Sequence, residues 1–579
     1  MTNTTAAAPW IDHLDGLPST LEYFHGSMFE AVERSAQLHP RKVAFDFMGS
    51  STTYREMIEN INKCARSLYY LGVRPGDRVT IALPNCPQAI YSFYATNMIG
   101  AIANMIHPLA SEKEIEFYLN KSKSVAAITL DQFYSKFDAV RDNTCVENII
   151  IASVKDELSP TLKAGYMLTE GRKIEPIPFD APVILWKQFT KMEKACTEDY
   201  RCDKGADDIA VILYSGGTTG KTKGIMLSNL NFNSSAEMII ASNPMYRPGD
   251  RMLAALPLFH GFGLGVCINA MLTHGGRCVL VPRFTAKSYA KLIVKYKCNY
   301  IAGVPTLFEA MLRLPTMQKA NLSSLKGAFS GGDTLSLDLK RRMDEFFVAH
   351  HAKIQVREGY GMTETVTACI LTPPDKYKEG SIGFPFPDTF AKIVEPGTDK
   401  VLPYGEEGEI LLSGPSIMHG YLDDEEETKK VLEDHADGRR WLRTGDIGCM
   451  DDEGYIYFKG RIKRMIISSG YNVYPAQIED ILLRHPAVDQ CCVIGVPDSY
   501  RMQVAKAYVV LKPEIPTSAQ TKSDLMDHCR KNIAKYAMPK DIVFKHSLPK
   551  TLIGKIAYRE LEDEHKAEIE KKAREESQS

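Results

Sequence analysis

Runs of apolar residues alternate with amphipathic segments over the first 380 residues. From Tyr54 to Leu71 apolar residues recur at helical spacing, and the next run, Arg78–Leu83, is short and rich in strand-forming residues. The same rhythm continues with apolar runs at 251–258, 278–282, 300–304 and 327–330. Strands that alternate with helices in this way predict an α/β fold with layers of mostly parallel sheet.

The longest apolar stretch, Ala89–Ile106, is interrupted by Thr96, Asn97, Gly100 and Asn104. It is too short and too polar to span a bilayer, which needs about 20 apolar residues. We therefore expect a buried helix followed by a buried strand at this place, and no transmembrane segment.

The pattern changes beyond about residue 380. Short strand-like runs such as Gly408–Gly414 and Gly454–Phe458 are separated by turns rich in glycine, proline and aspartate. These runs predict a small, mostly β subdomain at the end of a large N-terminal domain, for which we expect residues 1–460.

A second change begins at Gly460–Lys463. Pro475 suits the first position of a helix, and the strand-like run Ala505–Leu511 and a helical segment near 523–535 follow. We expect residues 461–579 to form a small, mobile α+β domain whose polar end, after about Glu560, is a solvated helix that frays into a tail.

Composition and charge exclude several classes of function. The 579 residues are 44% hydrophobic and 25% charged, as in an ordinary soluble globular protein, and the net charge of −2 gives no bulk attraction to nucleic acid. The thirteen cysteines are scattered without a C-x-x-C pair, and the first 33 residues contain no Lys or Arg. These features predict a cytoplasmic enzyme without a signal peptide. They leave peripheral membrane contact and the oligomeric state open.

The segment Tyr214–Gly224 carries the strongest chemical signal. Glycines, hydroxyl residues and two lysines directly follow the apolar run Ile209–Leu213. Glycine backbone can wrap closely around an anion, while hydroxyls add donors and lysines add positive charge. The segment therefore predicts a phosphate-binding loop whose contact residues are Ser215, Gly216, Gly217, Thr218, Thr219, Gly220 and Lys223.

Two other interpretations of this loop stay open when it is considered alone. The P-loop of kinases and ATPases, G-x-x-x-x-G-K-[ST], matches only its end, because Ser215 stands where the first glycine would be. A P-loop also runs into a helix, whereas Ile225–Leu227 predicts a short strand and the following Ser228-Asn229 a turn. A plain surface linker is the second alternative, and the lysines and hydroxyls argue against it.

Further glycine-punctuated polar segments follow in a fixed order along the chain. They are Ser330–Leu335, Glu358–Thr365, Trp441–Asp446, Gly460–Lys463 and Pro549–Lys555. Each segment alone is only moderately specific, and most of its residues would be ordinary surface or core residues. In this order, together with the loop, they resemble the adenylate-forming superfamily of acyl-CoA synthetases, nonribosomal adenylation domains and luciferases. The resemblance extends from about residue 30 to about residue 560, and Gly470–Pro475 is most similar to the fatty-acyl-CoA ligase branch.

The resemblance implies ATP-dependent activation of a carboxylic acid to an acyl-adenylate, with Mg²⁺, followed by transfer to coenzyme A. It implies that Thr218, Thr219 and Lys223 hold the β- and γ-phosphates and that Thr363 contacts the α-phosphate. Glu364 would bind Mg²⁺, a hard cation that prefers carboxylate oxygen. The expected contacts to adenosine are those of Gly331, Gly332, Glu358, Gly359, Tyr360, Gly361, Asp446 and Arg461, with Asp446 on the ribose hydroxyls.

The resemblance assigns the chemical step to Lys555, which would bridge the attacking carboxylate and the α-phosphate. Lys463 would lie at the hinge of the C-terminal domain, and Gly470 and Tyr471 would face coenzyme A after that domain rotates. The residues expected at the acyl group are His260, Phe262, Gly303, Gly331 and Gly361. His260 on its own is nearly as well explained as a half-buried histidine.

Two positions depart from the family pattern. Thr222 stands where the family usually has proline, and Asp333 stands where small apolar residues are common. The charge of Asp333, beside the expected acyl site, is compatible with a contact to the adenine amino group or with a restriction on the substrate.

Gly361 occupies the position of a tryptophan that closes the acyl pocket of acetyl-CoA synthetases, so we predict an acyl group larger than propionate. Medium- or long-chain fatty acids are the first expectation and aryl acids of the coumarate type the second. The alternatives are an enzyme that loads a separate carrier protein, a kinase or ATPase, and a non-catalytic nucleotide-binding protein. The presence of both Lys555 and Glu364 argues against the last.

Overall fold

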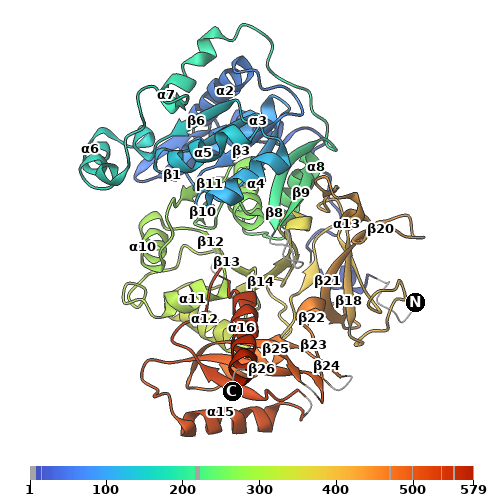
Figure 1. Cartoon of the computed structure of the whole chain (residues 1–579). Helices are drawn as coiled ribbons and strands as arrows, with labels where there is room; N and C mark the ends of the chain where they lie inside the picture. The colour runs from blue at the N-terminus through green and yellow to red at the C-terminus, as the bar shows by residue number, and fades with distance from the viewer. Residues whose placement is uncertain are drawn as a thin grey trace.

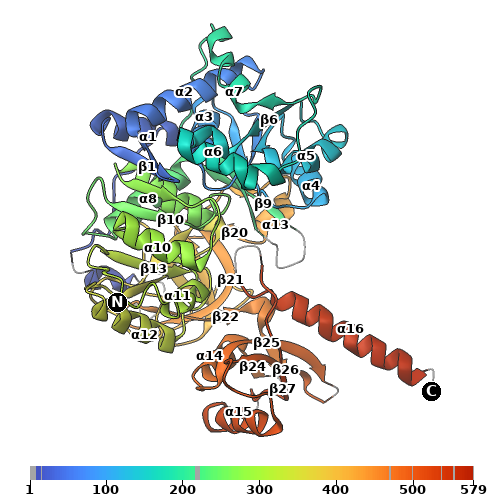
Figure 2. The same ribbon diagram turned by 90° about the vertical axis from the view of Figure 1, so that its left-hand side faces the viewer.

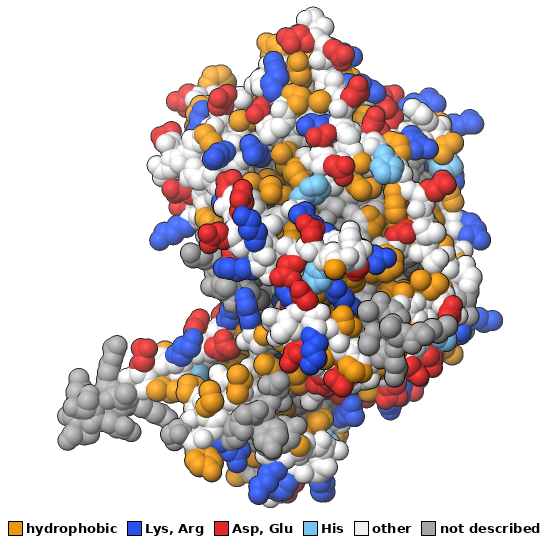
Figure 3. Space-filling view, turned by 90° about the vertical axis from the view of Figure 1, so that its right-hand side faces the viewer, with side chains coloured by type: hydrophobic (Ala, Val, Ile, Leu, Met, Phe, Trp, Pro, Cys, Tyr) orange, Lys and Arg blue, Asp and Glu red, His pale blue; other side chains and the backbone are white. Residues whose placement is uncertain are grey.

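A computed structural model describes residues 8–14, 16–215, 222–468, 471–498, 500–535, 537–551 and 555–577. Figure 1 shows an upper lobe, a central layer, a β subdomain at the side and a C-terminal unit below. On the face drawn in Figure 3, acidic and basic side chains are interspersed and neither sign dominates. No helix of the described residues is long and apolar enough to cross a membrane.

The upper lobe is built on a sheet with the strand order β19-β9-β8-β4-β3-β5-β6-β7. Its outer members are β19 (Gly420–Tyr421) at one edge and β5 (Ala126–Leu130), β6 (Asn148–Ala152) and β7 (Ile184–Leu185) towards the other. Its parallel strands include β3 (Arg78–Ala82), β4 (Ile102–Met105) and β8 (Ile209–Ser215). Strand β9 (Lys223–Ser228) then returns antiparallel to β8. The two strands form a hairpin at the edge of the parallel strands, and the glycine loop lies between them in the sequence.

A second sheet has the order β16-β15-β14-β13-β12-β10-β11-β1-β2 and carries the central layer (Figure 1). Its outer strands are β16 (Phe384–Pro385) at one edge and β10 (Arg251–Ala254), β11 (Arg277–Leu280), β1 (Val43–Phe47) and β2 (Ser50–Thr53) towards the other. Strands β12 (Tyr300–Gly303), β13 (Gly327–Gly331) and β14 (Val356–Gly361) are parallel, and β15 (Ala368–Leu371) runs antiparallel to β14. One hydrophobic core joins the two sheets. Helix α3 (Pro87–Met98), whose residues are all buried, lies within it.

Several elements agree with the sequence prediction, and one does not. The predicted helix from Tyr54 is α2 (Tyr54–Tyr70), and the stretch Ala89–Ile106 contains the expected buried helix and strand. The predicted turn at Ser228-Asn229 is wrong, because helix α8 (Asn229–Ala241) begins there. The Ser228 hydroxyl accepts from the backbone N–H of Asn231, and the Asn231 side chain accepts from the N–H of Ser228, which forms a capping box.

The predicted small β subdomain contains β17 (Phe390–Val394), β18 (Gly408–Ser413), β20 (Leu432–Asp434), β21 (Arg440–Met450) and β22 (Ile456–Arg461). Strands β21 and β22 are an antiparallel pair in which Asp446 and Arg461 are direct Cα partners. The long strand β21 therefore brings Asp446 beside Arg461, where the C-terminal domain begins.

The C-terminal unit has its own sheet and its own core. Strand β25 (Val488–Asp498) pairs along its length with the central strand β26 (Met502–Leu511), and helices α14 (Pro475–Leu483) and α15 (Ala519–Asn532) contribute to the same core. Pro475 is the first residue of α14, as predicted. Helix α16 (Tyr558–Ser577) projects from the body of the molecule, as Figure 2 shows.

Candidate active site

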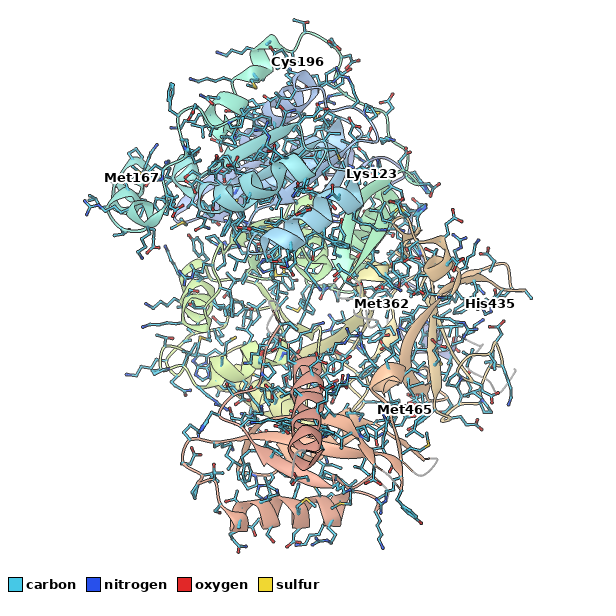
Figure 4. The ribbon with its side chains drawn as sticks, in the orientation of Figure 1. Lys123, Met167, Cys196, Met362, His435 and Met465 are labelled. Carbon is cyan, nitrogen blue, oxygen red and sulfur yellow. The ribbon has the colours of Figure 1, made fainter. Side chains whose placement is uncertain are left out.

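A cavity of about 1700 Å³ lies where the central layer, the β subdomain and the C-terminal unit meet. Figure 4 marks this region with Met362, at the centre of the molecule, and Met465, where the β subdomain gives way to the C-terminal unit. The predicted residues that line the cavity are Ser215, Lys223, His260, Phe262, Gly331, Gly332, Glu358, Gly359, Tyr360, Gly361, Thr363, Glu364, Asp446, Arg461, Lys463 and Lys555.

Glycines at the ends of β13 and β14 form one wall of this cavity. Gly331 and Gly359 are direct partners in the parallel register, and Gly332 has a φ of +83°, which favours glycine. A Cβ atom on Gly361 would lie 1.9 Å from the backbone oxygen of Thr367. The two backbones at this point are so close that only glycine fits at 361.

The segment after Gly361 is held by hydrogen bonds within itself. The Thr365 hydroxyl accepts from the N–H of Met362 at 3.1 Å and donates to the backbone oxygen of Thr367 at 2.7 Å. Buried Val366 has a φ of +64°, which is strained for a β-branched residue. The strain is maintained by close packing, because a Cβ on Gly261 would lie 1.7 Å from the Val366 oxygen.

Gly261 precedes a π-helical segment, Phe262–Asn269, which lies against this loop. Such segments are frequent at functional sites. Here the segment brings His260 and Phe262 to the cavity wall. The His260 ring nitrogen Nδ1 lies 3.2 Å from the N–H of Phe262, and desolvation, followed by the charge of Lys555, lowers the pKa of His260 to about 4. His260 is therefore neutral near pH 7.

Asp446, Tyr360 and Arg461 form a polar group that also lines the cavity. The Tyr360 hydroxyl donates to Asp446 Oδ2 at 2.7 Å, and Arg461 Nε lies 3.3 Å from Oδ1. Asp446 is almost fully buried, which raises its pKa, and Oδ1 has no hydrogen-bond donor among the described residues. A buried carboxylate oxygen that lines a cavity and lacks a hydrogen-bond donor is well placed to accept a hydrogen bond from a hydroxyl of a ligand.

Lys555 enters the cavity from the C-terminal unit. Its backbone oxygen accepts from the N–H of Thr551 at 2.7 Å. A Cβ on Gly332 would lie 3.3 Å from Lys555 Cε, so the side chain rests directly on the glycine wall. Desolvation there lowers the pKa of Lys555, while the charges of Asp333 and Asp446 act in the opposite direction.

A third polar group lies at the start of β9. Lys223 Nζ is 2.6 Å from Glu427 Oε2 and 4.3 Å from the centre of the Tyr421 ring. The Tyr421 hydroxyl donates to Glu364 Oε1 at 3.0 Å. The lysine of the glycine loop and the predicted Mg²⁺ ligand are thus connected through one tyrosine.

An apolar lobe extends from the glycine wall along the same face of the second sheet. Phe329 and Gly331 both lie on this face of β13, and their partners in the neighbouring strand β14 are Arg357 and Gly359. The lobe is also lined by Ile239, Phe262, Val266, Ala368, Leu371, Ile382 and Phe386. Gly303, predicted to contact the acyl group, does not line the cavity, because its missing side chain would point at Leu307, 2.4 Å away.

A family model described as AMP-binding enzyme matches residues 32–422, and one described as AMP-binding enzyme C-terminal domain matches residues 477–555. The chain belongs to the AMP-binding enzyme family. Both the resemblance to adenylate-forming enzymes and the predicted α/β fold are confirmed.

Named relatives and solved structures are similar over almost the whole length of this AMP-binding enzyme. It is 35% identical over 565 residues to the long-chain-fatty-acid–CoA ligase of Bacillus subtilis (strain 168), covering 96% of this chain and 98% of the relative. It is 32% identical over 509 residues to the probable 4-coumarate–CoA ligase 1 of Dictyostelium discoideum, covering 87% and 89%. The crystal structure of the anthranilate CoA ligase AuaEII in complex with anthranoyl-AMP aligns with a TM-score of 0.81 at 27% identity, covering 95% of this chain and 98% of that one.

These matches make the protein an ATP-dependent, AMP-forming acid–thiol ligase. Its glycine loop is described only in part. Gly216, Gly217, Thr218, Thr219 and Gly220 lie outside the described residues, as does Gly470. The backbone of Tyr471 forms part of β24 (Tyr471–Val473).

Sequence reasoning missed the Tyr421 and Glu427 side of the site. Glu427 ends an acidic run, Asp423–Glu427, which as a sequence is typical of a solvated surface. Tyr421 lies in a short strand, β19 (Gly420–Tyr421), which pairs with β9 and so brings this segment beside the lysine of the loop. No local sequence signal indicates that pairing.

The donor set is suitable for Mg²⁺. Glu364 presents a carboxylate to the cavity, and the Tyr421 hydroxyl holds one of its oxygens in place. Mg²⁺ in phosphate-transfer sites is bound through one or two carboxylates, substrate phosphates and water, so a single fixed glutamate in a phosphate-binding cavity meets that requirement.

Proposed function

We propose that this AMP-binding enzyme is an acyl-CoA synthetase that acts on a medium- or long-chain fatty acid. In the first half-reaction the carboxylate oxygen forms a bond to the α-phosphorus of ATP, and the bond from that phosphorus to the bridging oxygen of pyrophosphate breaks. In the second half-reaction the sulfur of coenzyme A attacks the acyl carbon. AMP leaves with the bonding electron pair and the thiol proton passes to solvent.

The position of Lys555 on the glycine wall carries this proposal. It rests on Gly332, in the same cavity as Asp446 and Thr363. Both reactants in the first half-reaction are anions, so a fixed cation between them lowers their repulsion most where charge is shared in the transition state. Lysine suits this role because it is a compact charge on a long stem that can be withdrawn.

The other residues would position the nucleotide. Oδ1 of Asp446, which has no hydrogen-bond donor within the described part of the chain, would accept from a ribose hydroxyl, with Arg461 beside it. Tyr360 and the glycines at 331, 332, 359 and 361 would hold adenine, beside Glu358. Lys223 with the loop hydroxyls would hold the pyrophosphate end. Mg²⁺, held by Glu364, would supply charge neutralisation at the phosphates.

The second half-reaction requires Lys555 to leave. We place the hinge for this movement at Lys463, near the start of a C-terminal domain of residues 461–579, which follows an N-terminal domain of residues 1–460. Lys463 lies in a single turn, Ile462–Arg464, between β22 and β23 (Ile466–Ser468). A short turn that joins two separately cored units can absorb a rotation.

The apolar lobe supports a fatty acyl substrate. From Gly361 back to Glu358, the innermost residue of β14 that lines the cavity, the strand covers three residues, or about 10 Å at roughly 3.3 Å per residue. That depth accommodates an extended chain of medium length, and the wall along it is mostly apolar. The similarity to the Bacillus subtilis ligase points the same way.

An aryl substrate is the second candidate, supported by a polar group beside the lobe. Asn243 lines the cavity and accepts from Arg357 at 2.9 Å, while buried Arg357 also donates to the backbone oxygens of Thr372 and Ser242. A polar group here would suit a ring that carries a hydrogen-bonding substituent. The similarity to the anthranilate and coumarate ligases favours the same alternative. Transfer to a separate carrier protein is a third.

The test is acid-dependent exchange of labelled pyrophosphate into ATP, run over a panel of fatty and aryl acids and followed by AMP release with coenzyme A. We expect exchange with fatty acids larger than propionate. Phosphate release without exchange would contradict adenylation. The best acid by kcat/KM decides between the fatty and aryl alternatives, and exchange without coenzyme A-dependent AMP release would indicate another acceptor.

A further inference from the structure

Glu427 holds the lysine of the glycine loop. It lies in the short helix α13 (Glu425–Lys429), and its Oε2 is 2.6 Å from Lys223 Nζ, across 204 residues of sequence. The Asp424 side chain accepts from the Glu427 N–H and caps this helix. Both Lys223 and Glu427 line the large cavity.

Both ends of this ion pair are partly shielded from solvent, and the Glu427 side chain is 28% exposed. The Lys223 side chain is 13% exposed, so its charge is costly without a counter-ion. Glu427 also bonds Lys430 through its other oxygen at 2.5 Å, and the Lys430 side chain is 64% exposed. These contacts, that to Lys223 foremost, lower the pKa of Glu427 to about 2, so it is fully ionised at neutral pH.

We propose that Glu427 is an internal competitor for the pyrophosphate end of ATP: it neutralises Lys223 in the nucleotide-free enzyme and is displaced when the phosphates bind. This inference rests on the proposed function, which assigns Lys223 to the β- and γ-phosphates. Glu427 acts through Lys223 and is therefore a positioning residue.

Lys430 lowers the free-energy cost of separating Lys223 from Glu427. When Lys223 turns to a phosphate oxygen, Glu427 keeps Lys430 as a partner of opposite charge, so this partly buried carboxylate is not left unpaired. The same competition favours release of the product, because Glu427 can reclaim Lys223 as pyrophosphate leaves. A fixed negative charge beside the phosphate site thus weakens ATP and pyrophosphate together, and leaves the acyl lobe unaffected.

The experiment compares E427Q with E426Q, a matched change at an exposed neighbour in the same helix. Glutamine retains the shape and a hydrogen bond to Lys223 but removes the charge. We expect E427Q to bind MgATP, by calorimetry, and pyrophosphate, as a product inhibitor, on the order of tenfold more tightly, the scale of one partly buried charge pair. E426Q should match the wild type, and E427D, which restores the charge, should return both values toward it.

Binding of MgATP and pyrophosphate by E427Q within twofold of wild type, or weaker than wild type, would overturn the inference. Weaker binding would mean that Glu427 supports the phosphates instead of competing with them. E427A also removes the charge and should likewise bind MgATP and pyrophosphate more tightly than the wild type. Thermal unfolding of each variant verifies that it is folded. If the wild type itself binds no MgATP and shows no acid-dependent exchange, the proposed function fails. If the wild type exchanges normally and E427Q behaves like it, only this inference fails.

Discussion

At the scale of single residues, the site depends on a few side chains whose environment differs from that of the surface. Lys555, Asp446 and His260 all have pKa values shifted in the direction that disfavours their charged forms, and burial is the first cause in each case. Such shifts concentrate at functional sites. Here they coincide with positions that the motifs had already indicated.

Replacement of Lys555 by alanine is expected to abolish the first half-reaction. The variant removes the cation between two anions, so acid-dependent pyrophosphate exchange should fall on the order of 10²–10³-fold. MgATP affinity, measured by calorimetry, should change only a few-fold, because Lys555 acts chiefly in the transition state. K535A, at an exposed lysine of the same unit, is the control. Normal exchange in K555A would contradict the role given to Lys555.

Gly361 is expected to tolerate no side chain. In G361A the new Cβ meets the Thr367 backbone oxygen, so we expect a loss of about 2–3 kcal/mol in unfolding free energy, the usual cost of overpacking, together with loss of exchange activity. G165A, at an open helical position, should be neutral or slightly stabilising. A G361A variant as stable as wild type would show that the two strands can separate.

Glu358 is expected to make stability depend on pH. Desolvation raises its pKa from 4.5 to about 7, so the folded state retains a proton that the unfolded state loses. Its stabilising contribution is complete below about pH 4.5 and is lost as the pH rises through 7. E358Q cannot ionise and can still accept from the N–H of Leu335, as Glu358 does now.

We therefore expect E358Q to be about 1–2 kcal/mol more stable than wild type at pH 8 and no more stable at pH 5. Thermal unfolding without nucleotide at the two pH values measures this difference. E379Q, at an exposed glutamate, should show no such pH dependence. An equal advantage of E358Q at both pH values would indicate a cause other than ionisation.

At the scale of elements, the site is assembled where strands end and helices begin. Strands β13 and β14 end in glycines, so backbone forms the wall, and β9 leads directly into α8. Asn231, in the first turn of α8, donates to the backbone oxygens of Pro415 and Ile417, at 2.8 and 2.9 Å. One side chain thus ties the helix start to the segment that leads into β19.

Loss of this connection should cost more than loss of the helix cap alone. We expect S228A to lower the unfolding free energy by about 1 kcal/mol, the usual value of a cap, and N231A by about 2–3 kcal/mol, because it leaves two buried oxygens without donors. Denaturant unfolding of the two variants gives the order. The reverse order would contradict the role of Asn231 as a connection between elements.

At the scale of the whole molecule, the catalytic lysine and the nucleotide wall belong to different units. Lys555 follows the sheet of the C-terminal unit, whereas Gly332 directly follows strand β13 of the second sheet in the large domain. The C-terminal unit has a separate hydrophobic core, so it can move without disrupting the other. Closure of the cavity therefore depends on how the C-terminal unit is placed against the large domain.

A rigid residue at the hinge is expected to separate the two half-reactions. K463P fixes φ at 463 in the turn between β22 and β23, so pyrophosphate exchange should stay within a few-fold of wild type while thioester formation with coenzyme A falls at least about tenfold. K463A separates the effect of the ring from that of the lost charge. Equal loss of both half-reactions in K463P would place the hinge elsewhere.

Local sequence determined a large part of this picture. The helix from Tyr54, the buried stretch Ala89–Ile106 and the helix that begins at Pro475 follow from apolar periodicity and the conformational preference of proline, which act over a few residues. The order of the glycine-rich segments determined the family, because each segment needs its own residue types whatever surrounds it. The turn predicted at Ser228 failed because a capping serine and a turn serine have the same local composition.

Tertiary structure alone decided which distant residues meet. The pairing of β19 with β9 brings Glu427 to Lys223, and the packing of the C-terminal unit brings Lys555 to Gly332. Gly361 shows the same difference between sequence and structure. The sequence suggested that this glycine leaves space for an acyl chain, whereas the structure shows that the close contact with the Thr367 backbone by itself requires glycine here. Charge and close approach act through space between segments far apart in the chain, so no local pattern could specify them.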